Sequence, residues 1–269
     1  MELNLAGQTA VIFGGAKGIG HAIAEAFSAE GVHVELLDID PNVEKSATAL
    51  AGRTGHSTCG RIADATDYSA LQGLAQQIAE ERPGPLHLVY AAGCGSGKYG
   101  FPFWNLSPDD WGRVLQVNLI GAVNAAHSFA PHWVNRQAGT MLLLSSIAGQ
   151  IGSQTDPPYS AAKAGLINFA QCSAKDLAPL NVRVNVICPG MVKTDVNRSV
   201  WQAWHDQQAE SDRLTYEEWA GEKAKRVAPL GRWQTVEDIA ALAVFLASER
   251  AHNITGQTMN VDGGQVMHW

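Results

Sequence analysis

The sequence predicts an α/β fold in which a mainly parallel β-sheet carries helices on both faces. Two observations support this expectation. Short apolar runs alternate with amphipathic stretches along the whole chain, and the runs are continuously apolar, as strands covered on both sides are. Neither an internal repeat nor a low-complexity linker divides the 269 residues. We therefore expect one domain over residues 1–269, with a seven-stranded sheet.

Glycine and proline mark the helix boundaries in the first half of the chain. The stretch Gly18–Glu30 has apolar residues at helical spacing and meets a natural stop at Gly31. Pro41 stands in the first turn of the next helix, where proline is tolerated, and Pro83 closes the third. In order, we expect a strand at Thr9–Phe13, a helix at Gly18–Glu30, a strand at Val32–Leu37, a helix at Pro41–Ala51, a strand at Ser57–Ile62, a helix at Asp67–Glu81 and a strand at Leu86–Ala92.

One segment breaks this alternation in the second half. Met191–Trp233 is long, polar and rich in tryptophan, and it stands between a strand and a helix. We interpret residues 191–233 as a substrate lobe or lid inserted into the domain. The other expected elements are helices at Asn118–Asn135, Tyr159–Leu180 and Val236–Ala247 and strands at Gly139–Ser145, Val182–Ile187 and Gln257–Val261.

Composition and charge exclude several classes of function. The net charge is −7, only 17% of residues are charged and no basic run occurs, so a nucleic-acid partner is not expected. The sequence has no apolar window of about 18 residues for a membrane span, and its start lacks the features of a signal peptide. The four cysteines form no CxxC pair and the nine histidines show no ligand spacing. We therefore expect free thiols in the cytoplasm and no metal site.

The stretch FGGAKGIG, Phe13–Gly20, joins the first strand to the first helix. A helix N-terminus offers free N–H groups and the positive end of the helix dipole, which together can hold a pyrophosphate. Glycine is needed where the backbone approaches such a ligand, and here the spacing is GxxxGxG over Gly14, Gly18 and Gly20. The alternative is a plain glycine turn. The flanking strand and helix favour a Rossmann-type, doubly wound dinucleotide-binding fold.

Asp38 ends the second expected strand, 18 residues after Gly20. An acid there can hydrogen-bond a ribose 2′-hydroxyl, and its charge disfavours the 2′-phosphate of NADP. Asp40 adds to this negative charge, whereas Lys17 in the glycine loop favours a 2′-phosphate. We expect NAD as the cofactor, with NADP less favoured. A solvated acid at a strand end is the alternative for Asp38.

Tyr159 and Lys163 form the motif YSAAK and, four residues apart on a helix, share one face. An ammonium near a phenol stabilises the phenolate and lowers its pKa from about 10 toward neutral, which makes tyrosine a usable general acid and base. Ser146 follows an apolar strand, from whose end it could hydrogen-bond a substrate oxygen. An incidental pair on a helix surface would be the better explanation of YxxxK taken alone.

Together, these motifs resemble those of the short-chain dehydrogenase/reductase family, and the resemblance covers nearly the whole chain. Each motif is weak alone, whereas their order and spacing are specific. Beside the glycine loop, Asp38, Ser146 and YSAAK, the resemblance rests on IADATD at Asp64, AAG at Ala91–Gly93, QVNLIG at Asn118, CPGMVKT at Cys188–Thr194 and the closing ITGQTMNVDGG.

The resemblance implies a role for each matching residue. Among the catalytic residues, Tyr159 moves the proton at the carbinol oxygen, Ser146 holds that oxygen, Lys163 bonds the nicotinamide ribose and Asn118 keeps a water in a proton relay. Asp64 and Ala65 would contact the adenine, and Thr194 with Val192 the carboxamide side of the nicotinamide. Expected substrate contacts are Cys94, Ser146, Gln150 and Tyr159. The expected cofactor-binding set is Gly14, Lys17, Gly18, Ile19, Gly20, Asp38, Ile39, Asp64, Ala65, Ala91, Ala92, Gly93, Tyr159, Lys163, Pro189, Gly190, Val192 and Thr194.

Two positions depart from the family pattern. Phe13 stands where a threonine is frequent, so a hydroxyl contact in the glycine turn is missing. Tyr90 and Ala91 replace the asparagines of NNAG, whose amides usually tie strands together. Neither change touches a reacting group, but both put the stability of this region and the affinity for the cofactor in doubt.

Three segments should determine the substrate: Cys94–Phe103, Gln150–Pro158 and the lobe Met191–Trp233. Aromatic faces beside carboxylates can hold a polyol or a sugar, and the lobe contains Trp201, Trp204 and Trp219 near acidic residues. The alternative is that these tryptophans pack the lobe onto the core.

These observations predict an enzyme, an NAD-dependent oxidoreductase acting on a secondary alcohol or ketone, with a polyol or sugar-like substrate favoured. One alternative is an NADPH-dependent ketone or 3-oxoacyl reductase. Another is a cofactor-binding regulator without catalysis, against which the intact Ser146, Tyr159, Lys163 and Asn118 argue. By resemblance, we also expect a homotetramer.

Overall fold

Seven parallel strands form the centre of the protein, as the sequence predicts. The computed structural model describes residues 2–268. The strand order is β3-β2-β1-β4-β5-β6-β7, and each neighbouring pair is parallel. The strands are β1 (Thr9–Phe13), β2 (His33–Asp38), β3 (Thr58–Ile62), β4 (Leu86–Tyr90), β5 (Gly139–Leu144), β6 (Val182–Pro189) and β7 (Thr258–Val261).

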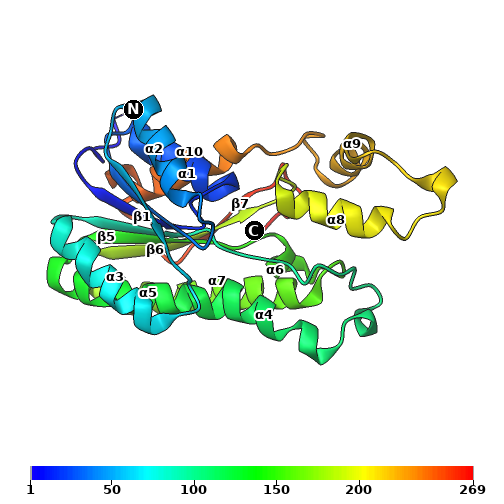
Figure 1. Cartoon of the computed structure of the whole chain (residues 1–269), viewed down its shortest axis with the longest axis horizontal. Helices are drawn as coiled ribbons and strands as arrows, with labels where there is room; N and C mark the ends of the chain where they lie inside the picture. Colours follow the sequence, from blue (N-terminus) through cyan, green and yellow to red (C-terminus); the bar gives the residue numbers. More distant parts are fainter. Residues whose placement is uncertain (1, 269) are drawn as a thin grey trace.

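Helices cover both faces of the sheet (Figure 1). One layer contains α1 (Gly18–Ala29), α2 (Val43–Thr54) and α10 (Val236–Ala247). The other contains α3 (Tyr68–Glu81), α5 (Gly121–Arg136) and α7 (Pro157–Leu177), with the short α4 (Gly112–Leu115) and α6 (Ala148–Ile151) beside them. Two further helices, α8 (Asp195–His205) and α9 (Tyr216–Val227), project to the right in Figure 1.

Two apolar layers, one on each face, explain why the strands are continuously apolar. Successive residues of a strand point to opposite faces. In β1, Ile12 packs in the layer that contains Phe27 of α1, and Val11 packs in the layer that contains Phe129 of α5. All five residues of this strand are buried. Strands of this kind form the core of a doubly wound α/β fold.

The helix expected at Asn118–Asn135 begins earlier and is distorted where Asn118 lies. It starts with α4 at Gly112 and continues into α5 through a π-helical turn at Gln116–Ile120. The Asn118 side-chain amide donates to the Val114 carbonyl at 2.9 Å, and the Gly121 amide bonds to Gln116, five residues back. The side chain thus takes an acceptor of the helix, which widens the turn.

Smaller differences concern the ends of elements. The helix α7 begins at Pro157 rather than at Tyr159, because the Asp156 side chain caps it and proline is tolerated at the first position. The strand β6 extends to Pro189, since it pairs with β7 up to Val261. The segment expected as a polar lobe, for which no secondary structure was predicted from the sequence, contains the helices α8 and α9.

A buried ion pair lies beside the edge strand β3. Glu35 of β2 is completely buried, and its carboxylate accepts hydrogen bonds from Arg61 at 3.0 Å and Arg82 at 3.3 Å. A carboxylate can occupy this apolar position only because two guanidinium groups compensate its charge.

We expect Glu35→Ala to lower the free energy of unfolding by about 3 kcal/mol, because the partly buried Arg61 and Arg82 lose the carboxylate that they share, although Arg61 keeps its ion pair with Glu81. Urea denaturation would measure this loss. Glu25→Ala is the matched control: Glu25 pairs with Arg53 on the surface, with both side chains about half exposed, and should cost about 1 kcal/mol or less. Equal losses in the two variants would contradict the assignment.

Candidate active site

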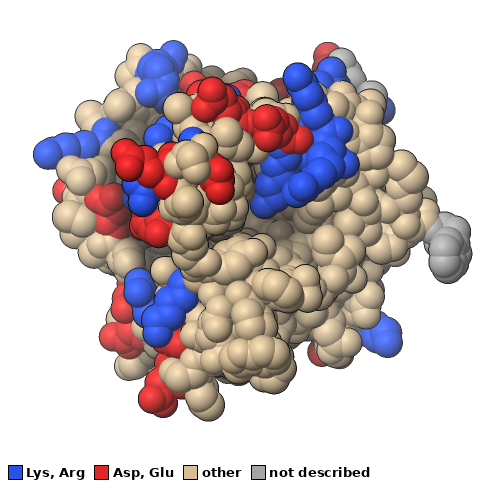
Figure 2. All heavy atoms as spheres, turned by 90° about the vertical axis from the view of Figure 1, so that its right-hand side faces the viewer, with Lys and Arg blue, Asp and Glu red and all other residues tan. Residues whose placement is uncertain are grey.

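The candidate residues follow the carboxyl ends of the central strands. The chain runs outward from β1 to β3 and then returns to place β4 on the other side of β1. Ligands of open α/β sheets bind at such a switch point, outside the carboxyl ends. Gly14 follows β1, Ala91 follows β4, Ser146 closely follows β5 and Gly190 follows β6. Figure 2 views the end of the molecule at which α8 and α9 project. Charged groups of both signs gather in its upper half beside a broad uncharged area.

The glycine loop between β1 and α1 packs tightly against its neighbours. Gly14 has a φ of +75°, and a Cβ there would lie 2.7 Å from the backbone nitrogen of Ala92. A Cβ at Gly20 would collide with the Gly14 carbonyl, whereas one at Gly18 would meet no atom within 4 Å. Lys17 precedes α1, and its side chain does not cap the helix. The first backbone amides of α1 can therefore hold an anion. Two of the glycines therefore serve packing, and the third lies in an open part of the loop.

The Asp38 carboxylate lies beside this loop, held by two backbone amides. Its oxygens accept from Ala16 and from Asp40, each at 3.0 Å. A carboxylate has about four acceptor positions, so capacity for a ribose hydroxyl remains. Hydrogen bonds from Asn42 lower the pKa of Asp40, and the charge of Lys17 adds to this effect. The positive charge of Lys17 is thus partly balanced by the acid at position 40.

Ser146, Tyr159 and Lys163 come together where β5 ends and α7 begins. The Ser146 side chain lies near enough to the Tyr159 phenol to lower its pKa, and the Lys163 ammonium lies 5.5 Å from the centre of the Tyr159 ring. Lys163 is buried and donates to the Leu144 carbonyl at 2.7 Å. The serine and the tyrosine can therefore contact one substrate oxygen, with the lysine behind the ring.

The pKa of Tyr159 differs from the expectation. Burial raises the pKa of Tyr159 to about 12, while Ser146 acts in the opposite direction and the charge of Asp156 raises it further. Burial also lowers the pKa of Lys163 to about 8. The expected shift toward neutral is wrong for the protein's own groups, because desolvation of the buried phenol is the largest effect on its pKa.

The Asn118 amide is fully buried between α7 and the loop after β4. Its Nδ2 donates to the carbonyls of Cys94 at 2.7 Å and Val114 at 2.9 Å, which determines its orientation. Its Oδ1 is buried without a hydrogen-bond partner in the described structure. A Cβ at Gly93 would lie 2.7 Å from this Oδ1 and 3.5 Å from the Lys163 nitrogen. Glycine at position 93 thus allows the backbone after β4 to lie close to two candidate catalytic residues.

The residues expected near the adenine lie around the ends of β2 and β3. Ile39 is 67% exposed, and the Asp64 carboxylate accepts from both the amide and the hydroxyl of Thr66 at 2.8 Å. The Ala65 carbonyl accepts from Asn124 of α5 at 3.0 Å. Asp64 and Ala65 therefore shape this end of the sheet through local hydrogen bonds.

The residues expected near the nicotinamide follow β6. Thr194 caps α8 by accepting from the Asn197 amide at 3.3 Å. Val192 is buried and pairs its backbone with Gln234. Gly190 lies against Asp262, whose Cα would be 2.7 Å from a Cβ at position 190. Contacts with Gln234 and Asp262 thus hold the residues that follow β6 in place at the start of the lobe.

The surroundings of Cys94 and Gln150 bear on their expected role as substrate contacts. Burial raises the pKa of the Cys94 thiol, which disfavours a role as a nucleophile. Gln150 exchanges two hydrogen bonds with Asn260, at 2.8 and 3.1 Å, and His268 lies 3.2 Å from its oxygen. The C-terminal tail is therefore anchored beside α6. Trp269, which follows His268, lies outside the described residues.

The two departures from the family pattern are adjacent in the structure. The rings of Phe13 and Tyr90 lie 5.7 Å apart, and both side chains are buried. The Tyr90 hydroxyl donates to the Val117 carbonyl at 2.6 Å, in the turn that carries Asn118. A Cβ at Gly121 would collide with this hydroxyl. An aromatic pair and one hydrogen bond thus tie β1 and β4 to the distorted helix.

The tryptophans of the lobe form a small cluster of their own, separate from the two layers around the sheet. Tyr216 and Trp219 of α9 are its buried members, and Trp201 and Trp204 of α8 pack against them. The interpretation that these tryptophans pack the lobe onto the core therefore needs correction, since they pack α8 against α9. The interpretation that they help to hold a polyol or sugar stays a prediction.

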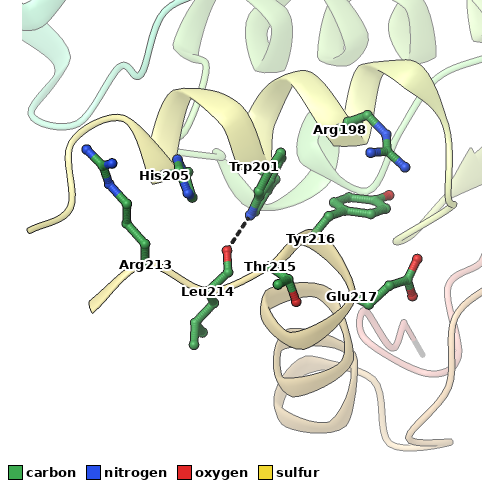
Figure 3. A pocket seen from close by; sticks show the side chains of 8 residues that line it. All are labelled: Arg198, Trp201, His205, Arg213, Leu214, Thr215, Tyr216 and Glu217. Atoms are coloured by element: carbon green, nitrogen blue, oxygen red, sulfur yellow. Dashed lines mark hydrogen bonds between the residues drawn. The ribbon is translucent and has the colours of Figure 1, made fainter. Parts of the chain in front are cut away.

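A cavity of about 490 Å³ lies between α8 and α9. In Figure 3, Arg198 projects toward Tyr216, and the Trp201 indole donates to the Leu214 carbonyl. The guanidinium lies 4.5 Å from the centre of the Tyr216 ring. Of the eight residues lining this cavity, Trp201 is one of the tryptophans considered for a sugar, and none belongs to the expected catalytic or cofactor-binding sets.

Within residues 2–268, no cluster of three or more histidine, cysteine, aspartate or glutamate side chains is arranged to hold a metal ion. In the same part of the chain, no helix combines the length and the apolar character that a membrane crossing requires.

Sequence reasoning missed Asp156. Its carboxylate caps α7 by accepting from the Tyr159 amide at 3.4 Å and also accepts from the Ser96 amide at 2.8 Å. An aspartate directly before two prolines is a signal for a helix start. The contact with a loop 60 residues away has no sequence signal.

Several known proteins are similar to this chain over almost its whole length. A family model described as enoyl-(acyl carrier protein) reductase matches residues 14–266. A 3-oxoacyl-[acyl-carrier-protein] reductase FabG of Chlamydia muridarum is 31% identical, over 98% of this chain and 99% of the relative. Among solved structures, the L-sorbose reductase of Gluconobacter frateurii with NADPH and L-sorbose superimposes with a TM-score of 0.90 at 26% identity. A putative gluconate dehydrogenase of Agrobacterium tumefaciens gives 0.86 at 25% identity, and each covers 100% of both chains.

We expect Tyr90→Phe to lower the free energy of unfolding by about 1–3 kcal/mol, because it leaves the Val117 carbonyl without its donor. Urea denaturation would measure the loss. Tyr68→Phe removes a hydroxyl that bonds His127 at the surface and should cost less. A loss at position 90 no larger than that at position 68 would show that the hydrogen bond to Val117 contributes nothing.

Proposed function

The chain belongs to the short-chain dehydrogenase/reductase family, and on that premise we propose that it is an NAD-dependent oxidoreductase that interconverts a secondary alcohol and its ketone. One observation carries the proposal. Ser146, Tyr159 and Lys163 meet at the carboxyl end of β5, where a hydroxyl, a phenol and a buried ammonium can serve one substrate oxygen and the cofactor beside it.

The described residues fit a dinucleotide. The first turn of α1 presents amides that no side chain caps, which suits a pyrophosphate. The Asp38 carboxylate keeps acceptor capacity after its bonds to Ala16 and Asp40, which suits a ribose diol. When bound, the nicotinamide ring accepts or delivers the hydride. The remaining tasks fall to the side chains of the chain itself.

Tyr159 is the group that we assign to proton transfer. With a pKa near 12, its phenol keeps its proton at neutral pH and can donate it to a developing alkoxide during ketone reduction. In the reverse direction the phenol has first to release its own proton, and the resulting phenolate then accepts the proton of the alcohol. Ser146, which lies near the phenol and lowers its pKa, is assigned to hold the same substrate oxygen and to stabilise charge on it.

Lys163 and Asn118 are assigned to the supply of that proton. The Lys163 ammonium donates to the Leu144 carbonyl and lies behind the Tyr159 ring. The buried Asn118 Oδ1 has no hydrogen-bond partner in the described structure and lies, like the Lys163 nitrogen, close to Gly93. A water that donates to this oxygen would satisfy it and could take part in the proton relay.

A polyol or sugar-like substrate is the finer part of the proposal. The L-sorbose reductase and the putative gluconate dehydrogenase, which share the fold over their whole length, are named for polyhydroxylated compounds. The face in Figure 2 carries a broad uncharged area, which suits a neutral substrate.

A second candidate is an NADPH-dependent ketone or 3-oxoacyl reductase. Lys17 in the glycine loop supports it, as do the FabG relative named for 3-oxoacyl reduction and the sorbose reductase crystallised with NADPH. We favour NAD because Asp38 is held where a 2′-phosphate would meet its charge, and because Asp40 partly balances Lys17. A homotetramer, expected from the resemblance, and a cytoplasmic location, expected from the separated cysteines, stay predictions.

We expect Tyr159→Phe to lose about 10²–10⁴-fold in turnover, because the substrate oxygen loses its proton donor. A panel of sugars, polyols and simple secondary alcohols, followed by NADH absorbance, would supply the substrate. NADH fluorescence should show that the variant still binds the cofactor. Full activity in this variant would refute the proposed mechanism.

We expect Asp38→Ser to raise the ratio of kcat/KM with NADP to that with NAD by at least about tenfold, because it removes a charged acceptor of the ribose hydroxyl and a repulsive charge. Asp40→Ser is the matched control and should change the ratio less, since the Asp40 carboxylate is occupied by Asn42. If the wild-type enzyme instead preferred NADPH and Lys17→Ala lost this preference, the result would establish the NADPH-dependent reductase.

A further inference from the structure

Asp156 joins two segments that the fold brings together at the proposed active site. One carboxylate oxygen accepts from the Tyr159 amide at 3.4 Å and caps α7. The other accepts from the Ser96 amide at 2.8 Å, in the loop that follows β4. A helix cap requires only one oxygen, which serine or threonine also supplies. The second contact therefore has a purpose that the helix alone does not explain.

The loop after β4 lies directly against the start of α7. A Cβ at Gly95 would approach the Asp156 Oδ2 to 2.8 Å, and a Cβ at Gly100 would collide with Pro157. The Gly100 amide also donates to the Thr155 carbonyl at 2.8 Å. Glycine at positions 95 and 100 thus allows the loop to contact residues 155–157.

The same loop is held from its other side by a candidate catalytic residue. Asn118 donates to the Cys94 carbonyl at 2.7 Å, two residues before Ser96. The segment Cys94–Ser96 is therefore hydrogen-bonded to Asn118 at one end and to Asp156 at the other. Asn118 and Asp156 belong to the helical segments that carry the proposed proton-transfer groups. A movement of Cys94–Ser96 would therefore change the position of Tyr159.

We propose that Asp156 is a positioning residue that clamps Cys94–Ser96 to the first turn of α7 and so sets the substrate-facing wall relative to Tyr159. This inference rests on the proposed function. Two of the three segments expected to determine the substrate, Cys94–Phe103 and Gln150–Pro158, then form one wall, and Asp156 connects them. The side chain acts through the loop and the helix rather than by touching the reacting atoms.

The charge of Asp156 acts on the same site. It raises the pKa of Tyr159, after the larger effect of burial, and the Cys188 and Cys94 thiols act in the same direction. Ser146 opposes them, and the Lys163 ammonium lies 5.5 Å from the ring centre. Removal of the Asp156 charge should therefore lower the pKa of the phenol, which a purely mechanical cap would not do.

Two variants separate the clamp from the cap. Asp156→Asn keeps a capping oxygen and the size of the side chain, but its NH₂ group cannot accept from Ser96. Asp156→Ser keeps a capping hydroxyl on a side chain one atom shorter. Asp67→Asn is the matched control, because Asp67 caps α3 through Ala70 and lies in another part of the chain.

Hydrogen exchange measured by mass spectrometry tests the clamp without turnover. We expect the peptide covering residues 94–100 to exchange about tenfold faster in both Asp156 variants, and at the wild-type rate in Asp67→Asn. Unchanged exchange in the Asp156 variants would overturn the proposal. If the wild-type enzyme turned over no alcohol or ketone, the proposed function would fail while this measurement still decided the clamp.

Steady-state kinetics test its consequence. In Asp156→Asn we expect KM for the ketone to rise about tenfold, as for one lost hydrogen bond to a charged group, with NADH binding unchanged. Reduction slows at high pH as Tyr159 loses its proton, and this decline should move to lower pH because the pKa of the phenol falls. A wild-type KM together with an unmoved decline would reduce Asp156 to a helix cap.

Discussion

The buried ammonium of Lys163 is the contact on which the site depends. It donates to the Leu144 carbonyl at the end of β5, while the Ser145 hydroxyl donates back to the Lys163 carbonyl at 2.8 Å. Gly149 allows α6 to approach the same residue, since a Cβ there would lie 2.7 Å from the Lys163 backbone. These contacts determine how α7 docks on the sheet. Tyr159, one turn earlier, consequently lies next to Ser146.

Burial of these groups creates a balance between solvation and charge. Desolvation raises the pKa of Tyr159 and lowers that of Lys163, so the protein by itself favours the uncharged form of each. Smaller effects then change the pKa of the phenol: Ser146 lowers it, and the Asp156 carboxylate and neighbouring thiols raise it. A site of this kind responds strongly to any charge brought beside it, because little water remains to screen that charge.

The sequence allowed the fold to be predicted because continuous apolar runs and glycine or proline boundaries are local signals. The seven strands and their parallel arrangement followed from them. Features that depend on contacts between distant segments could not be predicted. The π-helical turn at Asn118 requires its side chain to compete for the Val114 carbonyl, and the raised pKa of Tyr159 reflects burial, which no motif encodes. The separate packing of α8 against α9 likewise depends on tertiary contacts among aromatic rings.

The neighbouring side chains of Phe13, Tyr90 and Gly121 have a consequence for how this part of the sequence can evolve. The hydroxyl of Tyr90 occupies the space that a side chain at position 121 would need, and its ring packs on Phe13. A threonine at position 13 alone would leave a void against the tyrosine ring, and an asparagine at position 90 alone would strand the Val117 carbonyl. The three positions are therefore epistatic: exchange toward the pattern frequent in the family has to pass through a destabilised intermediate or occur in concert.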